Sequence, residues 1–279
     1  MKKIIVSLLV LGIAVLGFVL FREFRKNFGR VAGPAGQTGE TAGPEAGAYK
    51  ISDAALKEDS ARYVIIAKYP RLLGLSPAAD KNFNDAMLAL INQNVSDFKK
   101  NVAETPDTQV NSSLETNFDI VEENENFVSI LLIVDSYVAG AAHPARRLAS
   151  FNFDLEKGAV FGLKDVFKSG APYLERLSQF ARAELLESNK QEPFTDEATI
   201  NAGTEPKEEN FQVINFSAAG IAIVFNEYQV AAYAAGPQMV EIDYESVKDI
   251  LNEEGPLALF LAKTEEEAEP SLDSGSSPE

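Results

Sequence analysis

The residues best suited to acid–base or metal chemistry are scarce in this chain of 279 residues, which has one histidine, His143, and no cysteine. A disulfide framework and a thiolate metal site are therefore impossible. A single histidine also excludes zinc proteases of the H-E-x-x-H type and hydrolases that hold a metal with two histidines. Catalysis by carboxylates alone, or by a serine paired with His143, stays open, although no serine lies in a G-x-S-x-G motif.

Two loops combine aromatic side chains with small residues and proline, which allows close approach of a backbone or a partner. Tyrosine presents a large rigid surface with a polar tip, so both loops are candidate recognition surfaces. The alternatives are packing of the tyrosines against a sheet and a purely structural hydrogen-bonding role for His143. The predicted binding residues are Tyr137, Gly140, His143 and Pro144 in the first loop, and Tyr228, Tyr233, Gly236 and Pro237 in the second.

Two aspartates flank the first loop on adjacent predicted strands. Either Asp135 or Asp154 could orient His143, although aspartates at strand ends are more often simply solvated. We expect no metal ion and no cofactor, because the chain lacks a cluster of histidine and cysteine ligands.

Alternating and apolar patterns predict the elements that must position these loops. Apolar residues recur at three- and four-residue steps in two long predicted helices, at 77–102 and 172–188, and shorter helices are predicted at 163–167 and 244–252. Strands are predicted at 62–69, 114–123, 127–138, 147–155, 210–216, 221–225 and 240–243. Strands grouped as hairpins, with helices between the groups, predict an α+β fold in which antiparallel sheets pack with two long helices.

The N-terminus predicts a membrane anchor in front of this fold. Residues 4–21 are an uncharged, mainly apolar run of 18 residues, about 27 Å long as a helix and close to the hydrocarbon thickness of a bilayer. A cleaved signal peptide is the alternative, but the run passes into basic residues without an A-x-A-like site. Basic residues flank both ends, so charge alone leaves the orientation open.

Composition divides the rest of the chain. Residues 1–30 form the anchor with its basic flanks, and 31–50 are a flexible Gly/Pro/Ala linker. Residues 51–263 are predicted to form the folded domain, with a possible boundary between two subdomains near 105–145. Residues 264–279 are predicted to be an acidic disordered tail.

The charge of the chain narrows its partners. The formal net charge is −17, and residues 31–279 alone carry about −22, since 19 of the 25 basic and 41 of the 42 acidic residues lie there. Such a surface repels phosphate, so a nucleic-acid partner is not expected. A strongly basic protein is a possible partner, and mere solubility is the simpler interpretation.

Four motifs in order resemble a known family. They are YVAGAAHP at 137–144, FNFDLEKG at 151–158, LKDVF at 163–167 and IVFNEYQVAAYAAGP at 223–237. Together they resemble the RsiV-like extracytoplasmic domain of lysozyme-receptor anti-sigma factors, a domain that also precedes the catalytic module of PdaC-type peptidoglycan deacetylases. The resemblance covers roughly residues 60–252 and implies an α+β fold outside the membrane. Family members usually have G-G-A-H where this chain has Gly140–His143, and often Pro-Tyr where it has Ala232-Tyr233.

These observations predict a membrane-tethered extracytoplasmic binding or sensing module, and not an enzyme. Three residues before the predicted span leave no room for a segment that holds a sigma factor, and one histidine leaves none for a metal-dependent deacetylase module. The expected ligand is a cell-wall glycan or a basic wall-directed protein such as lysozyme. The alternatives are a structural or assembly protein of the envelope, and a hydrolase that uses His143.

Overall fold

The computed structural model describes residues 49–106 and 110–261, and all of these residues belong to one compact unit. The predicted anchor at 4–21, nearly all of the linker and the acidic tail lie outside these ranges. Within 49–106 and 110–261, no helix is both long and apolar enough to cross a bilayer.

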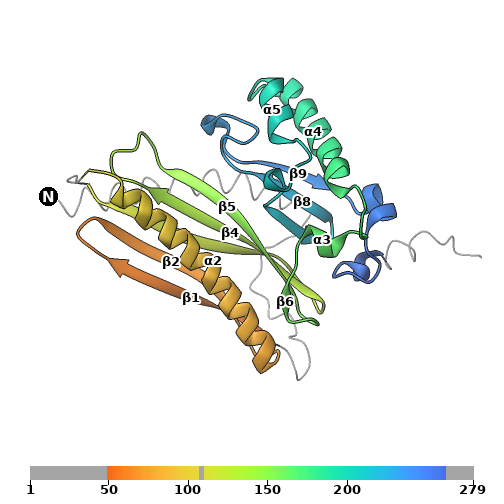
Figure 1. The fold of residues 1–279 in the computed structure, drawn as a ribbon, viewed down its shortest axis with the longest axis horizontal. Helices are drawn as coiled ribbons and strands as arrows, with labels where there is room; N and C mark the ends of the chain where they lie inside the picture. The colour runs from red at the N-terminus through yellow and green to blue at the C-terminus, as the bar shows by residue number, and fades with distance from the viewer. Residues whose placement is uncertain (1–48, 107–109, 262–279) are drawn as a thin grey trace, which may run out of the picture. The chain divides into compact units, whose positions relative to one another are not determined.

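The larger sheet has six strands in the order β1-β2-β3-β4-β5-β6 (Figure 1). All neighbouring pairs are antiparallel except β2 and β3, which run parallel. A parallel pair needs a long crossover, and the helix α2 (Pro77–Ala103) supplies it. The strands are β1 (Lys50–Asp59), β2 (Tyr63–Leu73), β3 (Ser112–Glu123), β4 (Phe127–Tyr137), β5 (Ala145–Asp154) and β6 (Ala159–Val160).

Helix α2 covers one face of this sheet (Figure 1). It begins where the Ser76 side chain accepts a hydrogen bond from the backbone N–H of Ala79, with proline at the first helical position. Phe83 from its apolar stripe makes edge-to-face contacts with Phe151 and Phe153 of β5 at 5.0 and 5.1 Å between ring centroids. These contacts join the helix to the strand that leads out of the histidine loop.

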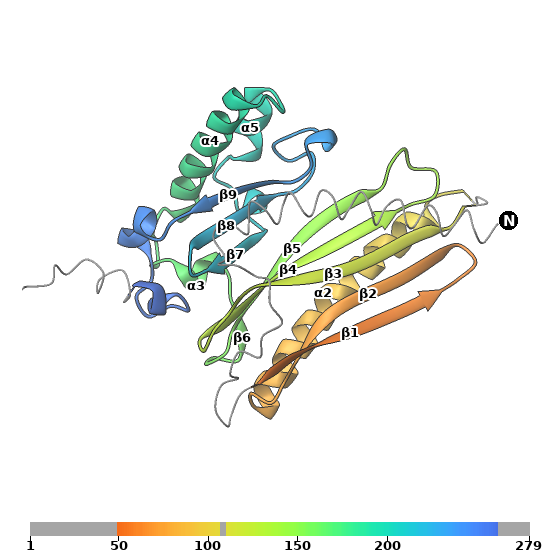
Figure 2. The ribbon, with the colours of Figure 1, turned by 180° about the vertical axis from the view of Figure 1, so that it is seen from behind.

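The smaller sheet is antiparallel, in the order β7-β8-β9, and is seen from behind in Figure 2. Its strands are β7 (Ile214–Ser217), β8 (Gly220–Phe225) and β9 (Gln238–Ile242). The helices of this part are α3 (Leu163–Val166), α4 (Tyr173–Gln191) and α5 (Glu197–Gly203), with 3₁₀ turns η1 (Glu208–Asn210), η2 (Tyr233–Ala235) and η3 (Glu245–Ile250). Helix α4 packs in one apolar core with these strands.

Side chains of the two sheets meet in a buried polar network. The Ser129 hydroxyl on β4 donates to Asn152 Oδ1 on β5 at 2.7 Å. The Ser129 hydroxyl oxygen also accepts hydrogen bonds from Asn215 Nδ2 at 3.0 Å and from the backbone N–H of Phe216 at 3.1 Å. Asn152 Nδ2 in turn donates to the carbonyl oxygen of Ile214 at 2.9 Å. Strand β7 is therefore fixed in register against β4 and β5.

The α+β class, the two long helices and the hairpin strands agree with the prediction. The predicted antiparallel pairing is confirmed for every neighbouring pair except β2 and β3, which are parallel because the chain crosses over through α2 before it forms β3. The helix predicted at 244–252 is a 3₁₀ segment, which the Asp243 side chain starts by accepting from the N–H of Ser246. The strands β1 and β6 and the helix α5 were not predicted.

Candidate functional site

The two predicted loops meet at the end of the larger sheet. The connection from β4 to β5 carries His143, and the connection from β8 to β9 carries Tyr228 and Tyr233. The His143 and Tyr233 rings stack with centroids 3.8 Å apart and planes 26° apart. The Tyr228 ring lies 6.0 Å from the Tyr233 ring at the same angle. We call these three rings the aromatic shelf.

Hydrogen bonds fix the orientation of the imidazole. His143 Nδ1 lies 2.8 Å from the carbonyl oxygen of Pro144, which can only accept, so Nδ1 carries a proton. In the neutral ring Nε2 is then an acceptor, and the Tyr228 hydroxyl donates to it over 3.1 Å. Tyr228 is 61% exposed, so the outer edge of the shelf faces solvent.

The backbone at the shelf adopts conformations that favour particular residues. Tyr228 has a φ of 67°, the only positive φ of a non-glycine residue among those described. Such a conformation costs a bulky residue about 1 kcal/mol or more. Gly236 combines a φ of 67° with a ψ of −172°, a region that is open to glycine alone.

Charged groups surround the shelf. Arg146 of β5 makes a two-pronged ion pair with its cross-strand partner Asp135, with Nε–Oδ1 and Nη2–Oδ2 distances of 2.7 and 2.8 Å. This pairing raises the pKa of Arg146. Glu227 accepts from the backbone N–H of Arg146 over 3.4 Å. Burial raises the pKa of Glu227, and Arg146 and His143 oppose this effect. Burial also raises the pKa of the Tyr233 hydroxyl.

The loop that carries Tyr228 is anchored on both sides. The Asn226 side chain pairs with the backbone of Leu148 on β5, accepting from its N–H at 2.7 Å and donating to its carbonyl at 3.0 Å. Gln229 Nε2 donates to the carbonyl oxygens of Asn210 and Gly203. Gly203 is required there, because a Cβ at this position would overlap the carbonyl oxygen of Gln229.

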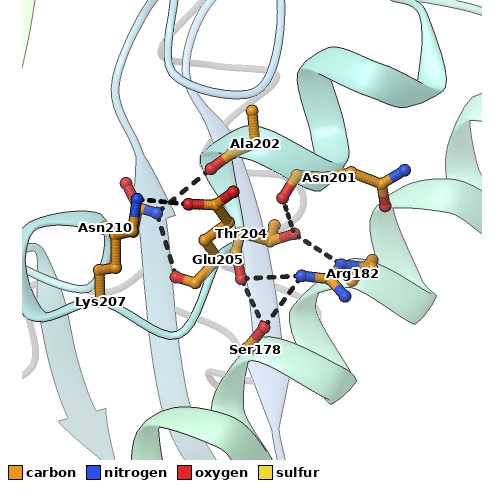
Figure 3. Close-up of polar contacts among 8 residues, drawn as sticks. All are labelled: Ser178, Arg182, Asn201, Ala202, Thr204, Glu205, Lys207 and Asn210. Atoms are coloured by element: carbon orange, nitrogen blue, oxygen red, sulfur yellow. Dashed lines mark hydrogen bonds and ion pairs between the residues drawn. The ribbon is translucent and has the colours of Figure 1, made fainter.

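The end of α5, which supports this loop, is itself held by a polar cluster (Figure 3). Arg182 of α4 donates from Nε to the Thr204 hydroxyl at 3.1 Å, and the Ser178 hydroxyl donates to the Thr204 carbonyl. Thr204 and Ser178 are buried, so these bonds satisfy groups that water does not reach. The position of Tyr228 therefore depends on α4 and α5 as well as on its own loop.

The structure brings some predicted residues together and leaves others apart. His143, Tyr228 and Tyr233 are in contact, and Pro144 accepts from His143 through its carbonyl oxygen. Tyr137 ends β4 opposite Ser113 of β3. Gly140, Gly236 and Pro237 belong to the loop backbones, where the two glycines have positive φ.

Neither Asp135 nor Asp154 is hydrogen-bonded to His143, so the possibility that one of them orients the ring is not realised. Asp135 is engaged by Arg146. Asp154 lies at the far end of β5, where it accepts from the N–H of Lys157 at 2.8 Å in the turn toward β6. Both aspartates lie on the strands that flank the loop, but Asp154 is the last residue of β5, and the length of that strand separates it from the loop.

Arg146 and Glu227 were not predicted as site residues. Each lies one or two positions from a predicted one, yet sequence alone does not show that they meet across 81 positions of the chain. Within the described part of the chain, no group of three or more His, Cys, Asp or Glu residues could hold a metal ion.

Two comparisons of the sequence, with a family model and with a characterised protein, each match part of this chain. Residues 164–245 match the family model described as "Protein of unknown function (DUF3298)". The chain is 32% identical over 177 residues to the peptidoglycan-N-acetylmuramic acid deacetylase PdaC of Bacillus subtilis, a match that covers 63% of this chain and 37% of that protein.

Two solved structures share the fold. A DUF3298 family member from Bacteroides fragilis has a TM-score of 0.51 at 17% identity and covers 78% of this chain and 98% of its own. A DUF3298 family protein from Pseudomonas aeruginosa has a TM-score of 0.52 at 14% identity and covers 74% and 95%. The α+β fold of this chain is thus that of DUF3298 structures, and its residues 164–245 match the DUF3298 family itself.

Proposed function

We propose that this chain is a binding module for cell-wall glycan, tethered outside the membrane. The observation that carries the proposal is the aromatic shelf with its rim of charged groups. The apolar C–H face of a sugar ring can pack on Tyr228 and Tyr233, while hydroxyls at the ring edge pair with the carboxylate of Glu227 and its neighbours. The similarity to an enzyme named for peptidoglycan supports this class of ligand.

The proposed location rests on the N-terminal sequence and on the resemblance to the RsiV-like domain. An uncharged run at 4–21 followed by a domain with a charge of about −22 suits a single-pass anchor with the domain outside. Protease added to intact cells should degrade the domain. Degradation only after the cells are broken would contradict the proposal.

We also propose that the site is not catalytic. Both imidazole nitrogens of His143 are engaged, by Pro144 and Tyr228, and no serine, threonine or carboxylate among the described residues is hydrogen-bonded to the ring. A hydrolase would instead need a serine or carboxylate within reach of the imidazole. Release of acetate or of reducing ends from purified peptidoglycan by the chain would contradict this proposal.

A titration tests the glycan proposal directly. The full chain, purified in detergent, is titrated calorimetrically with the N-acetylglucosamine–N-acetylmuramic acid disaccharide. We expect Tyr233→Ala to weaken binding about tenfold, because it removes the central ring of the shelf. Tyr233→Phe is the matched control, since it keeps the ring and should bind nearly as well as wild type. Equal affinity of all three proteins would refute the shelf as the binding surface.

A basic wall-directed protein such as lysozyme is the second candidate ligand. The charge of about −22 on residues 31–279 favours it, because long-range attraction would speed the encounter. This candidate predicts an affinity that falls steeply as salt rises, whereas stacking of a sugar on the shelf depends little on salt. Capture of lysozyme that persists unchanged at high salt would argue against the electrostatic mechanism.

A further inference from the structure

A second concave surface lies farther along the same face of β5. It is a cleft of about 410 Å³, within the usual size range of small-molecule sites. Ser150 and Asn152 of β5 line one side, and the segment from β6 into α3 lines another. Glu208 of η1, Ile214 at the start of β7 and Gln212 between these elements line the remaining side.

The lining of the cleft combines an apolar floor with polar groups that lack partners. Phe161 and Phe216 stack with centroids 5.5 Å apart and, like Phe211, are buried. The Gln212 side-chain amide and the Tyr173 hydroxyl form no hydrogen bond to another described residue, although Tyr173 interacts electrostatically with Lys164, so both can bond to a ligand. An apolar floor with a few hydrogen-bonding groups suits a sugar better than a purely apolar molecule.

An exposed ion pair spans the cleft between two of its walls. Lys164 Nζ of α3 lies 3.0 Å from Glu208 Oε1 of η1, and both side chains are more than 60% exposed. Such pairs contribute little to stability, about 0–1 kcal/mol. Breaking this pair therefore costs little, which leaves Lys164 able to turn to a ligand carboxylate such as that of N-acetylmuramic acid.

The cleft and the aromatic shelf share one strand and two linked loops. Side chains of Arg146, Ser150 and Asn152 project from the same face of β5, because their positions differ by even numbers. Arg146 at the shelf and Ser150 in the cleft lie about 13 Å apart along the strand. The loops at the two sites are joined where Gln229 Nε2 donates to the carbonyl oxygen of Asn210 at 2.9 Å.

We infer that the cleft is a second subsite for the same glycan, and that the module binds a chain of several sugars long enough to reach both the shelf and the cleft. This inference rests on the proposed glycan function. A disaccharide placed on the shelf would not reach the cleft, whereas a longer strand would occupy both. The affinity of the protein would then increase with the length of the glycan.

A substitution at Gly162 can block the cleft without removing any existing contact. Gly162 lines the cleft, has an extended backbone that any residue adopts, and has no atom within 4 Å of the position a Cβ would take. Its N–H donates to Asp165 Oδ2, and this bond survives substitution. Gly162→Trp therefore adds a bulky side chain at the wall of the cleft, and Gly162→Ala is the matched control.

The experiment compares the disaccharide with its hexasaccharide, both titrated into the full chain. We expect wild type and Gly162→Ala to bind the hexasaccharide at least about tenfold more tightly than the disaccharide. Gly162→Trp should lose this gain and keep wild-type affinity for the disaccharide, with an unchanged melting temperature as evidence of intact folding.

Three results would count against the inference. If Gly162→Trp keeps the preference for the hexasaccharide, the cleft is not a subsite and the shelf proposal survives. If wild type binds both sugars equally, the site does not extend beyond the shelf. If wild type binds neither sugar, the glycan function itself fails and the inference falls with it.

Discussion

The buried network between the two sheets makes a quantitative prediction for Ser129→Ala. The Ser129 oxygen is the centre of the network, with one bond donated to Asn152 and two accepted from Asn215 and Phe216. Ser129, Asn152 and Asn215 are all at most 5% exposed. Removing the hydroxyl leaves the Asn152 Oδ1 and the Phe216 N–H without their partners and deprives Asn215 of one of two acceptors.

The size of the effect follows from these lost partners. A buried polar group left unpaired costs about 1–3 kcal/mol. Two fully orphaned groups and one partly orphaned group therefore predict a loss of about 3–5 kcal/mol in the free energy of unfolding. For a domain of this size, each kcal/mol lowers the melting temperature by about 2–4 °C, so a fall of about 6–20 °C is expected.

Ser150→Ala is the matched control on the neighbouring strand. Ser150 also bonds toward the smaller sheet, donating to the Gln212 carbonyl at 3.3 Å and accepting from the Ile214 N–H at 3.1 Å. It is only half-buried, so water can replace the lost hydroxyl and a loss of about 1 kcal/mol is expected. The chain has no tryptophan, so urea unfolding is followed by circular dichroism. If Ser129→Ala and Ser150→Ala lose stability by amounts within about 1 kcal/mol of each other, the buried network is not a main link between the sheets.

Three further predictions concern the support and electrostatics of the shelf. Gly203→Ala should destabilise the chain by about 2 kcal/mol or more in thermal unfolding, because its methyl group overlaps the Gln229 carbonyl; an unchanged melting temperature would disprove the close packing. Arg146→Lys should lower the free energy of unfolding by about 1–2 kcal/mol, since lysine cannot form the two-pronged ion pair with Asp135. A double-mutant cycle that combines it with Asp135→Asn measures the coupling energy of this pair. Burial raises the Glu227 pKa above the ordinary 4.5, so its contribution to stability is complete below that value and is lost as pH rises through the folded-state pKa. Urea unfolding at a series of pH values should therefore show Glu227→Gln gaining on wild type as pH rises through that window, and parallel curves would contradict the cause given for the shift.

Much of the fold could be predicted because apolar periodicity reports burial. The stripe of α2 and the continuous apolar run of β4 gave elements close to those observed, since β4 is buried on both faces between α2 and the smaller sheet. Strand β1 was missed because its sequence KISDAALKED is charged and has no clear alternation. Its ten residues become a strand through pairing with β2, which is a tertiary effect.

The candidate site was predictable in its loops and not in its partners. Aromatic and small residues marked both loops, and the structure brings His143 of one against Tyr233 of the other. Arg146 and Glu227 carried no comparable signal, because charged residues are common on surfaces and their meeting depends on how β8 is placed against β5. The cleft was not predictable for the same reason, since its walls come from segments far apart in sequence.

The left-handed backbone of Tyr228 sets stability and function against each other. Glycine would adopt a φ of 67° without strain, so Tyr228→Gly relieves the backbone while it removes an exposed ring. An exposed tyrosine contributes little to folding, and selection for stability alone would replace it. Retention of tyrosine at this position in natural variants of the chain would therefore be a sign that the ring is kept for what it touches outside the molecule.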